Sequence, residues 1–213
     1  GGNFFACLKQ CRGEYVAFLE GDDYWCSPRK LKLQVDLLDG DPGAAGCFAD
    51  AQVVDADGRL IHDDYFAYHG RHEVKDVVHT EDIVPFGISP ACTIVFRRSV
   101  LDDPPDWFVR NTWHSGLDLL ITLRGSYRYV RETLGAYRIH PGGIWSGAAP
   151  ADRLMSDLLF LKPMYHDAAM RAGWGRAIRE SIRAGLRGLL ECSHEGERTV
   201  KILRCYRQFL SAY

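Results

Sequence analysis

The chain has 213 residues, of which 46% are hydrophobic and 25% are charged, with a formal net charge of −2. This composition is typical of a globular protein that buries a substantial core, and the charge gives no reason to expect a nucleic-acid-binding protein. The seven scattered cysteines form no C-x-x-C pair, so we expect reduced thiols in a cytoplasmic protein, without a zinc site or a disulfide framework. No apolar run approaches the length of a membrane span, and no signal peptide is visible.

The charges divide the chain into two parts. Residues 1–150 carry 15 Lys and Arg against 21 Asp and Glu, whereas residues 151–213 carry 11 against 7. Helical spacing is predicted in the second part, at about 151–170, 175–192 and 197–212. Such basic helices either present a solvated face or touch an anionic membrane surface or a partner. We therefore predict a first domain over residues 1–150 and a helical C-terminal extension over residues 151–213.

The first part alternates between helix and strand. Its predicted elements are a helix at 3–12, a strand at 15–19, a helix at 28–40, strands at 45–54 and 88–98, a helix at 114–123 and a short strand at 127–129. Residues 60–85 show no clear period and are predicted to form a loop-rich insertion. Alternation with short connections predicts an α/β fold, with a mostly parallel sheet flanked by helices.

Three carboxylates follow the strand at 15–19 without a polar spacer. They belong to Glu20, Asp22 and Asp23, grouped around Gly21. Carboxylates this close repel one another unless a cation or a hydrogen-bonding partner lies among them. Oxygen ligands at the end of a strand suit Mg²⁺ or Mn²⁺. The alternative is a solvated polar turn that caps the next helix.

Two blocks of sequence carry a recognisable pattern. The first reads CRGEYVAFLEGDDYWCSPRKLKLQV at residues 11–35, and the second reads YRIHPGGIWS at residues 137–146. Together they resemble family 2 glycosyltransferases with the GT-A fold. Both occur in the family's order, and the resemblance, to bacterial members, covers residues 3–146. It implies a Rossmann-like GT-A domain with a mixed, mostly parallel sheet.

The resemblance implies a metal-dependent sugar transfer, with inversion as the expected stereochemical outcome. The donor would be a nucleoside-diphosphate sugar, and the acceptor would be a hydroxyl of a glycan or of a lipid-linked molecule. Asp22, Asp23 and His140 match the metal site for Mn²⁺ or Mg²⁺, although His140 has the alternative of an ordinary loop histidine. Glu20 takes the leading acidic position and Asp22 also matches a donor contact.

Further donor and acceptor positions follow from the same blocks. Arg138 and Trp145 match the block that closes the donor site. Counting back from Gly125 places His114 where the family has an Asp base, and Asp118 lies one helical turn later. Both residues are therefore candidates for the base that deprotonates the acceptor hydroxyl.

The resemblance also suggests a setting and two alternatives. It implies synthesis of cell-surface polysaccharide in the cytoplasm, with the basic helices as a potential contact to the inner face of the membrane. Relatives carry a β-α-β portion that grips the nucleoside before the segment at 3–12, so this chain alone is expected to bind nucleotide sugar weakly. The alternatives are a nucleotidyltransferase and a truncated binding module without catalytic activity.

Overall fold

A computed structural model of the chain describes residues 2–84, 86–110 and 114–192. By compactness the chain divides into two units, Gly1–His140 and Pro141–Tyr213. The predicted helix at 197–212 lies outside the described residues. The predicted domains, 1–150 and 151–213, remain a proposal.

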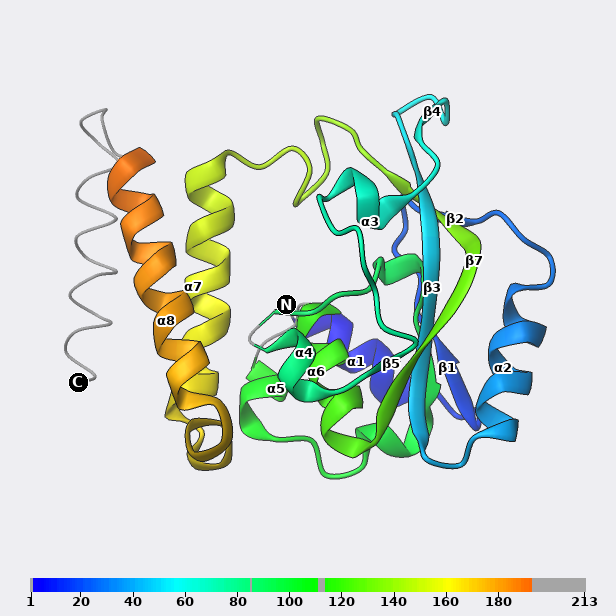
Figure 1. Ribbon diagram of the computed structural model, residues 1–213, viewed down its shortest axis with the longest axis horizontal. Helices are drawn as coiled ribbons and strands as arrows, with labels where there is room; N and C mark the ends of the chain where they lie inside the picture. The colour runs from blue at the N-terminus through cyan, green and yellow to red at the C-terminus, as the bar shows by residue number, and fades with distance from the viewer. Residues whose placement is uncertain (1, 85, 111–113, 193–213) are drawn as a thin grey trace. The chain divides into compact units, whose positions relative to one another are not determined.

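The first unit is built on a mixed sheet of seven strands (Figure 1). These strands are β1 (Tyr15–Ala17), β2 (Tyr24–Trp25), β3 (Ala44–Val54), β4 (Leu60–His62), β5 (Val77–Val78), β6 (Val95–Arg97) and β7 (Ser126–Arg138). The order across the sheet is β1-β6-β3-β7-β2, with β4 paired to β3 and β5 paired to β7. Among the described strands, β3 and β7 pair in parallel and every other pair is antiparallel.

The sheet is therefore mixed, and the expected predominance of parallel pairs is not found. Parallel neighbours require a crossover connection, usually through a helix. The chain between β3 and β7 includes such a helix, α6 (His114–Arg124). By contrast, β6 follows the 3-10 turn η1 (Ala91–Thr93) and lies antiparallel to both β1 and β3.

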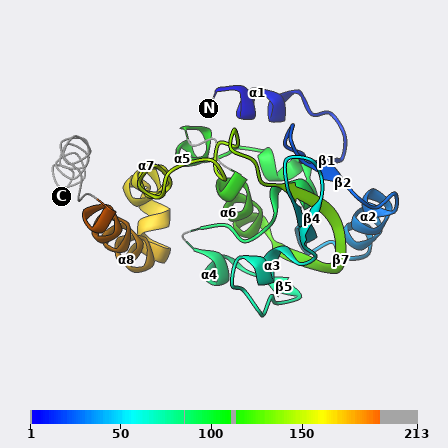
Figure 2. The same cartoon turned by 90° about the horizontal axis from the view of Figure 1, so that it is seen from above.

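Helices cover both faces of this sheet. The helical segments of the first unit, besides α6 and η1, are α1 (Gly2–Gln10), α2 (Lys30–Gly40), α3 (Tyr65–Tyr68), α4 (Thr80–Ile83), η2 (Arg98–Leu101) and α5 (Asp106–Arg110). Figures 1 and 2 show α2 and α6 on opposite sides of β3. Adjacent residues of β3 face these two helices, since Cys47 packs with Leu38 of α2 whereas a Cβ on Gly46 would meet Ile121 of α6.

Helix α2 buries one polar stripe along the sheet. Its buried residues are Lys30, Gln34 and Leu38, which are spaced four apart and therefore share one face. Gln34 Nε2 donates a hydrogen bond of 2.7 Å to the Thr93 carbonyl. Leu31, in contrast, is 42% exposed. This face therefore buries the Lys30 amine, which lies over the Trp25 ring, and the Gln34 amide.

The described part of the second unit contains two helices that pack against each other. They are α7 (Pro150–His166) and α8 (Ala168–Cys192), and α8 is kinked at Trp174. The two helices approach closely at Gly185 and Gly188, which have no side chain. An added Cβ at these positions would lie 3.1 and 3.0 Å from leucine side chains of α7. No helix within the described ranges has both the length and the hydrophobicity needed to cross a membrane.

Candidate functional site

The acidic turn connects β1 to β2 at one end of the sheet. The Asp23 amide donates a hydrogen bond of 3.3 Å to the Glu20 carbonyl, which closes the turn. The Asp22 side chain is 44% exposed, whereas Asp23 is only 9% exposed. The two neighbouring aspartates therefore lie in different environments, one accessible and one buried.

Asp23 has one bound and one unpartnered carboxylate oxygen. Its Oδ1 accepts a hydrogen bond of 2.9 Å from the Arg138 amide. Its Oδ2 is buried and accepts no hydrogen bond of normal geometry from the described residues, although the Cys92 thiol lies close enough to lower the pKa of this carboxylate slightly. Burial raises the pKa of Asp23 to about 7, and the neighbouring carboxylates of Glu20 and Asp22 also raise it. A buried carboxylate oxygen is costly without a partner, so this atom fits a site that a cation completes.

Arg138 donates hydrogen bonds both to the acidic turn and to the turn that follows β3. Its Nε donates to the Asp22 carbonyl at 2.8 Å, and its Nη1 donates to the carbonyls of Asp55 and Ala56 at 3.1 and 2.9 Å. Its guanidinium also lies over the Tyr24 ring, 5.6 Å from the ring centroid. Arg138 is thus placed at the site, where it holds the backbone and carries a positive charge.

His140 lies beside the exposed aspartate. Its Nε2 is 3.1 Å from Asp22 Oδ2, so the first part of the second sequence block contacts the acidic turn. Glu20 is half-buried next to Asp23 and is part of the same turn. Trp145 belongs to the second unit and is 37% exposed there.

The carboxylates and the histidine do not form a complete metal cage. Within the described residues, no group of three or more His, Cys, Asp or Glu side chains is arranged to hold a metal ion. Mg²⁺ usually takes one or two protein carboxylates and fills its shell with water and substrate phosphates. Asp23, with its unpartnered Oδ2, fits this kind of incomplete site.

Trp25, Lys30 and Cys92 pack together next to the acidic turn. The Trp25 indole donates a hydrogen bond of 3.0 Å to the Cys92 carbonyl, and Lys30 Nζ lies 4.6 Å from the centroid of a Trp25 ring. Lys30 is 1% exposed and its Nζ has no hydrogen-bond partner among the described residues. Burial lowers the pKa of Lys30 to about 8. The Cys92 thiol lies near both Lys30 and Asp23, and burial raises its pKa well above the usual value.

Asp118 is fully buried in a hydrogen-bond network. Its Oδ2 accepts from the amides of Ile88 and Ser89 at 2.8 and 3.0 Å, and its Oδ1 accepts from the Ser89 and Tyr127 hydroxyls at 2.6 and 3.0 Å. A side chain at Gly87 would collide with this carboxylate. The arrangement ties the segment at Gly87–Ser89 to α6.

The second candidate base, His114, is the first residue of α6, and its side chain lies outside the described part of the structure. Tyr65 of the loop-rich insertion lies near Asp118 of α6 and near Cys92, which neighbours the acidic turn. Burial raises the pKa of Tyr65, with smaller contributions from groups that include Cys92 and Asp118. Cys92 in turn lies beside Asp23, so the start of α6 and the acidic turn flank one region.

Sequence reasoning did not single out Lys30, Cys92 or Tyr65. Lys30 stands inside the first sequence block, but its helical spacing gives no sign that the amine points inward. Cys92 and Tyr65 approach the site only through tertiary contacts. Their residue types alone gave no signal, because small thiols and tyrosines are common in cores.

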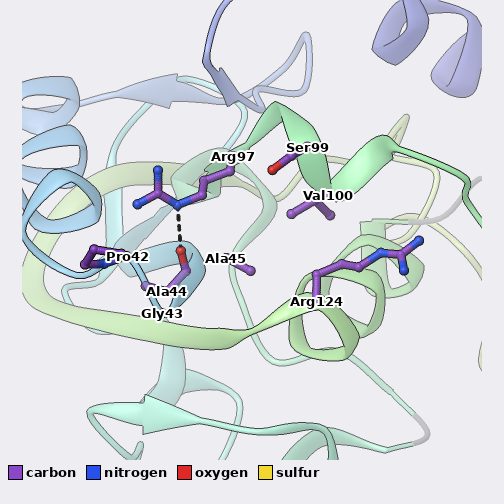
Figure 3. A pocket seen from close by; sticks show the side chains of 8 residues that line it. All are labelled: Pro42, Gly43, Ala44, Ala45, Arg97, Ser99, Val100 and Arg124. Atoms are coloured by element: carbon purple, nitrogen blue, oxygen red, sulfur yellow. Dashed lines mark hydrogen bonds between the residues drawn. The ribbon is translucent and has the colours of Figure 1, made fainter.

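A separate cavity of about 310 Å³ lies at the opposite end of β3 (Figure 3). Arg97 and Arg124 line it, and the two guanidinium groups point in different directions. Arg97 donates to the carbonyls of Ala44 and Leu38, and Arg124 donates to carbonyls of the Asp102–Asp103 turn. Both arginines therefore hold backbone, which explains their presence without an anionic ligand.

Comparison with known proteins gives distant relatives. The chain is 31% identical over 147 residues to uncharacterised proteins of Mycobacterium bovis and Mycobacterium tuberculosis, a match covering 68% of this chain and 40% of each relative. It is 26% identical over 193 residues to an uncharacterised glycosyltransferase of a Nostoc species, covering 84% of this chain and 57% of the relative. The chain thus spans less than two thirds of these relatives. No protein-family model matches it.

Proposed function

We propose that this chain carries the donor-phosphate site of a metal-dependent glycosyltransferase, with the GT-A fold and a family 2 relationship. The observation that carries the proposal is the buried, unpartnered Oδ2 of Asp23 in a turn with two further carboxylates. The distant similarity to a Nostoc protein named as a glycosyltransferase supports the same class. The substrates would be a nucleoside-diphosphate sugar and a hydroxyl of a glycan or lipid-linked acceptor.

The residues of the turn suit Mn²⁺ or Mg²⁺. Asp23 would offer Oδ2, and Asp22 with His140 forms the second pair of candidate ligands. Such a cation, when bound, neutralises charge on the leaving nucleoside diphosphate. Arg138 keeps the turn in place and adds positive charge at the same end of the sheet. Glu20 would act on the donor through water, and Trp145 remains a proposed donor contact.

We assign the base to the start of α6. The base would take the acceptor hydroxyl proton while that oxygen attacks the anomeric carbon and the nucleoside diphosphate leaves, inverting the configuration. Asp118 accepts four hydrogen bonds in the core, which favours His114 as the base and Asp118 as a positioning residue. A base must come within hydrogen-bond reach of the proton that it abstracts.

The test of the function is release of nucleoside diphosphate from a panel of UDP-, GDP- and dTDP-sugars with Mn²⁺. We expect metal-dependent release, lowered about a hundredfold in Asp23→Ala, because even the outer partners of metal ligands contribute about 10–100-fold. Asp63→Ala is the matched control, since that side chain is 89% exposed. Metal-independent release, or equal rates in Asp23→Ala and wild type, would contradict the proposal. Pyrophosphate formed from a nucleoside triphosphate and a sugar phosphate would indicate a nucleotidyltransferase, and no turnover would indicate a binding module.

A second experiment separates the two candidate bases. Transfer rates of His114→Ala and Asp118→Asn are measured with the same donor, alongside urea unfolding. We expect the larger rate loss in His114→Ala, and a loss of about 1–3 kcal/mol of stability in Asp118→Asn, because the new amide would face hydrogen-bond donors. Rate effects below about tenfold in both variants, about 1.4 kcal/mol, would remove both residues from the role of base.

The proposed setting is cytoplasmic synthesis of cell-surface polysaccharide. No nucleic-acid partner is expected from the charge of the chain. A peripheral contact with the inner face of the membrane, through the basic C-terminal helices, is proposed as well.

A further inference from the structure

Asp50 is a buried carboxylate outside the acidic turn. It lies on β3 and is 7% exposed. The residues that follow it on β3 pair with Gly135–Arg138 of β7, which is the segment whose last amide holds Asp23. Asp50 therefore lies on the strand segment that leads to the proposed donor site.

One oxygen of Asp50 is held and the other is available. Oδ1 accepts hydrogen bonds from the amides of Ala51 and Tyr65, at 2.8 and 3.1 Å. Oδ2 accepts none from the described residues, yet it is not among the buried unpartnered atoms, so solvent reaches it. No Lys or Arg forms an ion pair with Asp50 within the described ranges. The two amides fix the direction of the free oxygen.

The neighbouring carboxylates of Asp63 and Asp64 are less buried than that of Asp50. Asp64 caps α3, where its Oδ1 accepts from the Ala67 amide at 2.8 Å. Asp63 is 89% exposed to solvent and is thus not fixed by packing. Burial raises the pKa of Asp50 to about 6, and Asp64 and Asp63 add to this effect. Asp50 is thus the buried carboxylate of the three, with one oxygen held by two amides and the other reached by solvent.

The residue whose amide holds this carboxylate belongs to a group of packed aromatic rings. The backbone amide of Tyr65 donates to Asp50. The ring of Tyr65 packs edge-on against the ring of Tyr137, with centroids 5.4 Å apart. The ring of His69 lies 4.4 Å from that of Tyr65 and 6.2 Å from that of Tyr137. Helix α3, which carries Tyr65, packs on β3 (Figure 1).

This combination selects a class of ligand. An ionised carboxylate only accepts hydrogen bonds, so the ligand must donate them. Aromatic rings offer flat apolar surface next to such a polar group. A sugar ring carries hydroxyl donors at its edge and C–H groups on its face, and therefore matches both features.

We propose that Asp50 Oδ2 and the rings of Tyr65 and His69 form a subsite for a neutral sugar of the acceptor. The assignment rests on the proposed function, since it names the acceptor as a glycan. Asp50 accepts hydrogen bonds from sugar hydroxyls, and Tyr65 and His69 contact the face of the sugar ring. Together these residues bind the acceptor on the strand that leads to the donor site.

The test measures sugar binding without donor or metal. Saturation-transfer NMR is recorded in the presence of EDTA with neutral methyl glycosides of glucose, galactose, mannose, rhamnose and N-acetylglucosamine. We expect at least one glycoside to bind wild type, and to bind Asp50→Asn about tenfold more weakly, because hydrogen bonds to charged groups contribute more than this. Asp63→Asn is the matched control and should bind as wild type does. Binding by none of the glycosides, or equal binding by Asp50→Asn and wild type, overturns the proposal.

A second variant guards against a folding defect. Tyr65→Leu keeps the amide that holds Asp50 and removes the ring, so it should weaken glycoside binding while the melting temperature shows that the protein is folded. Asp23→Ala should bind the glycosides as wild type does. Loss of donor release in Asp23→Ala tests the proposed function, whereas glycoside binding tests only the Asp50 subsite, so the two failures are distinguishable.

Discussion

At the residue scale, the two adjacent aspartates of the turn differ in what surrounds them. Asp22 is exposed and its carboxylate contacts His140. Asp23 is buried: its Oδ1 accepts a hydrogen bond from the Arg138 amide, and its Oδ2 has no hydrogen-bond partner of normal geometry in the described structure. Burial, the largest cause, raises the pKa of Asp23 to about 7 from an ordinary value of 3.8. The folded protein therefore holds a proton on Asp23 at a pH where the unfolded chain has released it.

This shift predicts a pH-dependent effect of Asp23→Asn on stability. Because the folded pKa is the higher one, wild type loses stability as pH rises from about 4 to about 7, and the loss persists above that range. The neutral Asn avoids this loss while its oxygen can still accept from the Arg138 amide. We expect Asp23→Asn to exceed wild type by on the order of 2–4 kcal/mol at pH 8, with little difference at pH 4.

Urea unfolding at both pH values measures this difference. Asp63→Asn serves as the control, because its side chain is 89% exposed and its difference from wild type should vary little with pH. Added Mn²⁺ should raise the stability of wild type at pH 8 more than that of Asp23→Asn. A stability difference between Asp23→Asn and wild type that is the same at both pH values would show that burial does not perturb this carboxylate.

At the scale of elements, the long pair of β3 and β7 organises the first unit. Their parallel pairing runs from Ala44 and Ser126 to Val54 and Arg138. The pair therefore carries Arg138 to the acidic turn and leaves the cavity lined by Arg97 at the other end. Adjacent residues Gly46 and Cys47 face α6 and α2 respectively, so the sheet is covered on both sides.

Gly46 provides a test of this packing. An added Cβ would lie 2.9 Å from Ile121 Cγ2, 3.0 Å from Phe96 Cβ and 3.1 Å from the Val95 carbonyl oxygen. Overpacking of this kind costs about 1–3 kcal/mol, so we expect Gly46→Ala to lower the free energy of unfolding by that amount. Gly40→Ala is the control, since nothing lies within 4 Å of its added Cβ, and it should change stability by less than about 1 kcal/mol. Similar urea midpoints for Gly46→Ala and wild type would mean that α6 does not pack closely on β3.

At the scale of the whole molecule, the chain joins an acidic first part to a basic second part. Residues 1–150 carry an excess of carboxylates, and residues 151–213 carry an excess of Lys and Arg. On α8, Arg179, Arg183 and Arg187 are four residues apart and share one side of the helix. Arg183 and Arg187 are exposed.

We expect this side of α8 to attract anionic lipid. Basic residues near such a surface contribute about 1 kcal/mol each, so Arg183→Glu with Arg187→Glu should weaken binding to phosphatidylglycerol vesicles by about tenfold or more. Co-sedimentation at low and high salt measures the effect, which salt should reduce. The control is Lys9→Glu with Arg12→Glu, which reverses two exposed charges in the first unit. Equal losses in both double variants would point to net charge alone and not to α8.

The sequence alone determined the local features of this protein. Periodicity and the positions of Gly and Pro, which act over a few residues, predicted several elements. These are α2, β3, α6 and the two C-terminal helices α7 and α8. The grouping of Glu20, Asp22 and Asp23 was visible as well. The loop-rich insertion was predicted only as such, and its short helix α3 was not foreseen, because a single turn leaves almost no periodic signal.

Only the tertiary structure decided what these residues contact. Asp23 receives its hydrogen bond from Arg138, 115 positions away, and no local pattern encodes such a pairing. Lys30 points into the core and Asp118 is saturated with hydrogen bonds because of which helix face meets the sheet. The antiparallel direction of β6 depends in the same way on how the chain returns to the sheet. Burial, pKa and strand direction all depend on contacts between distant segments, and those contacts form only when the chain folds.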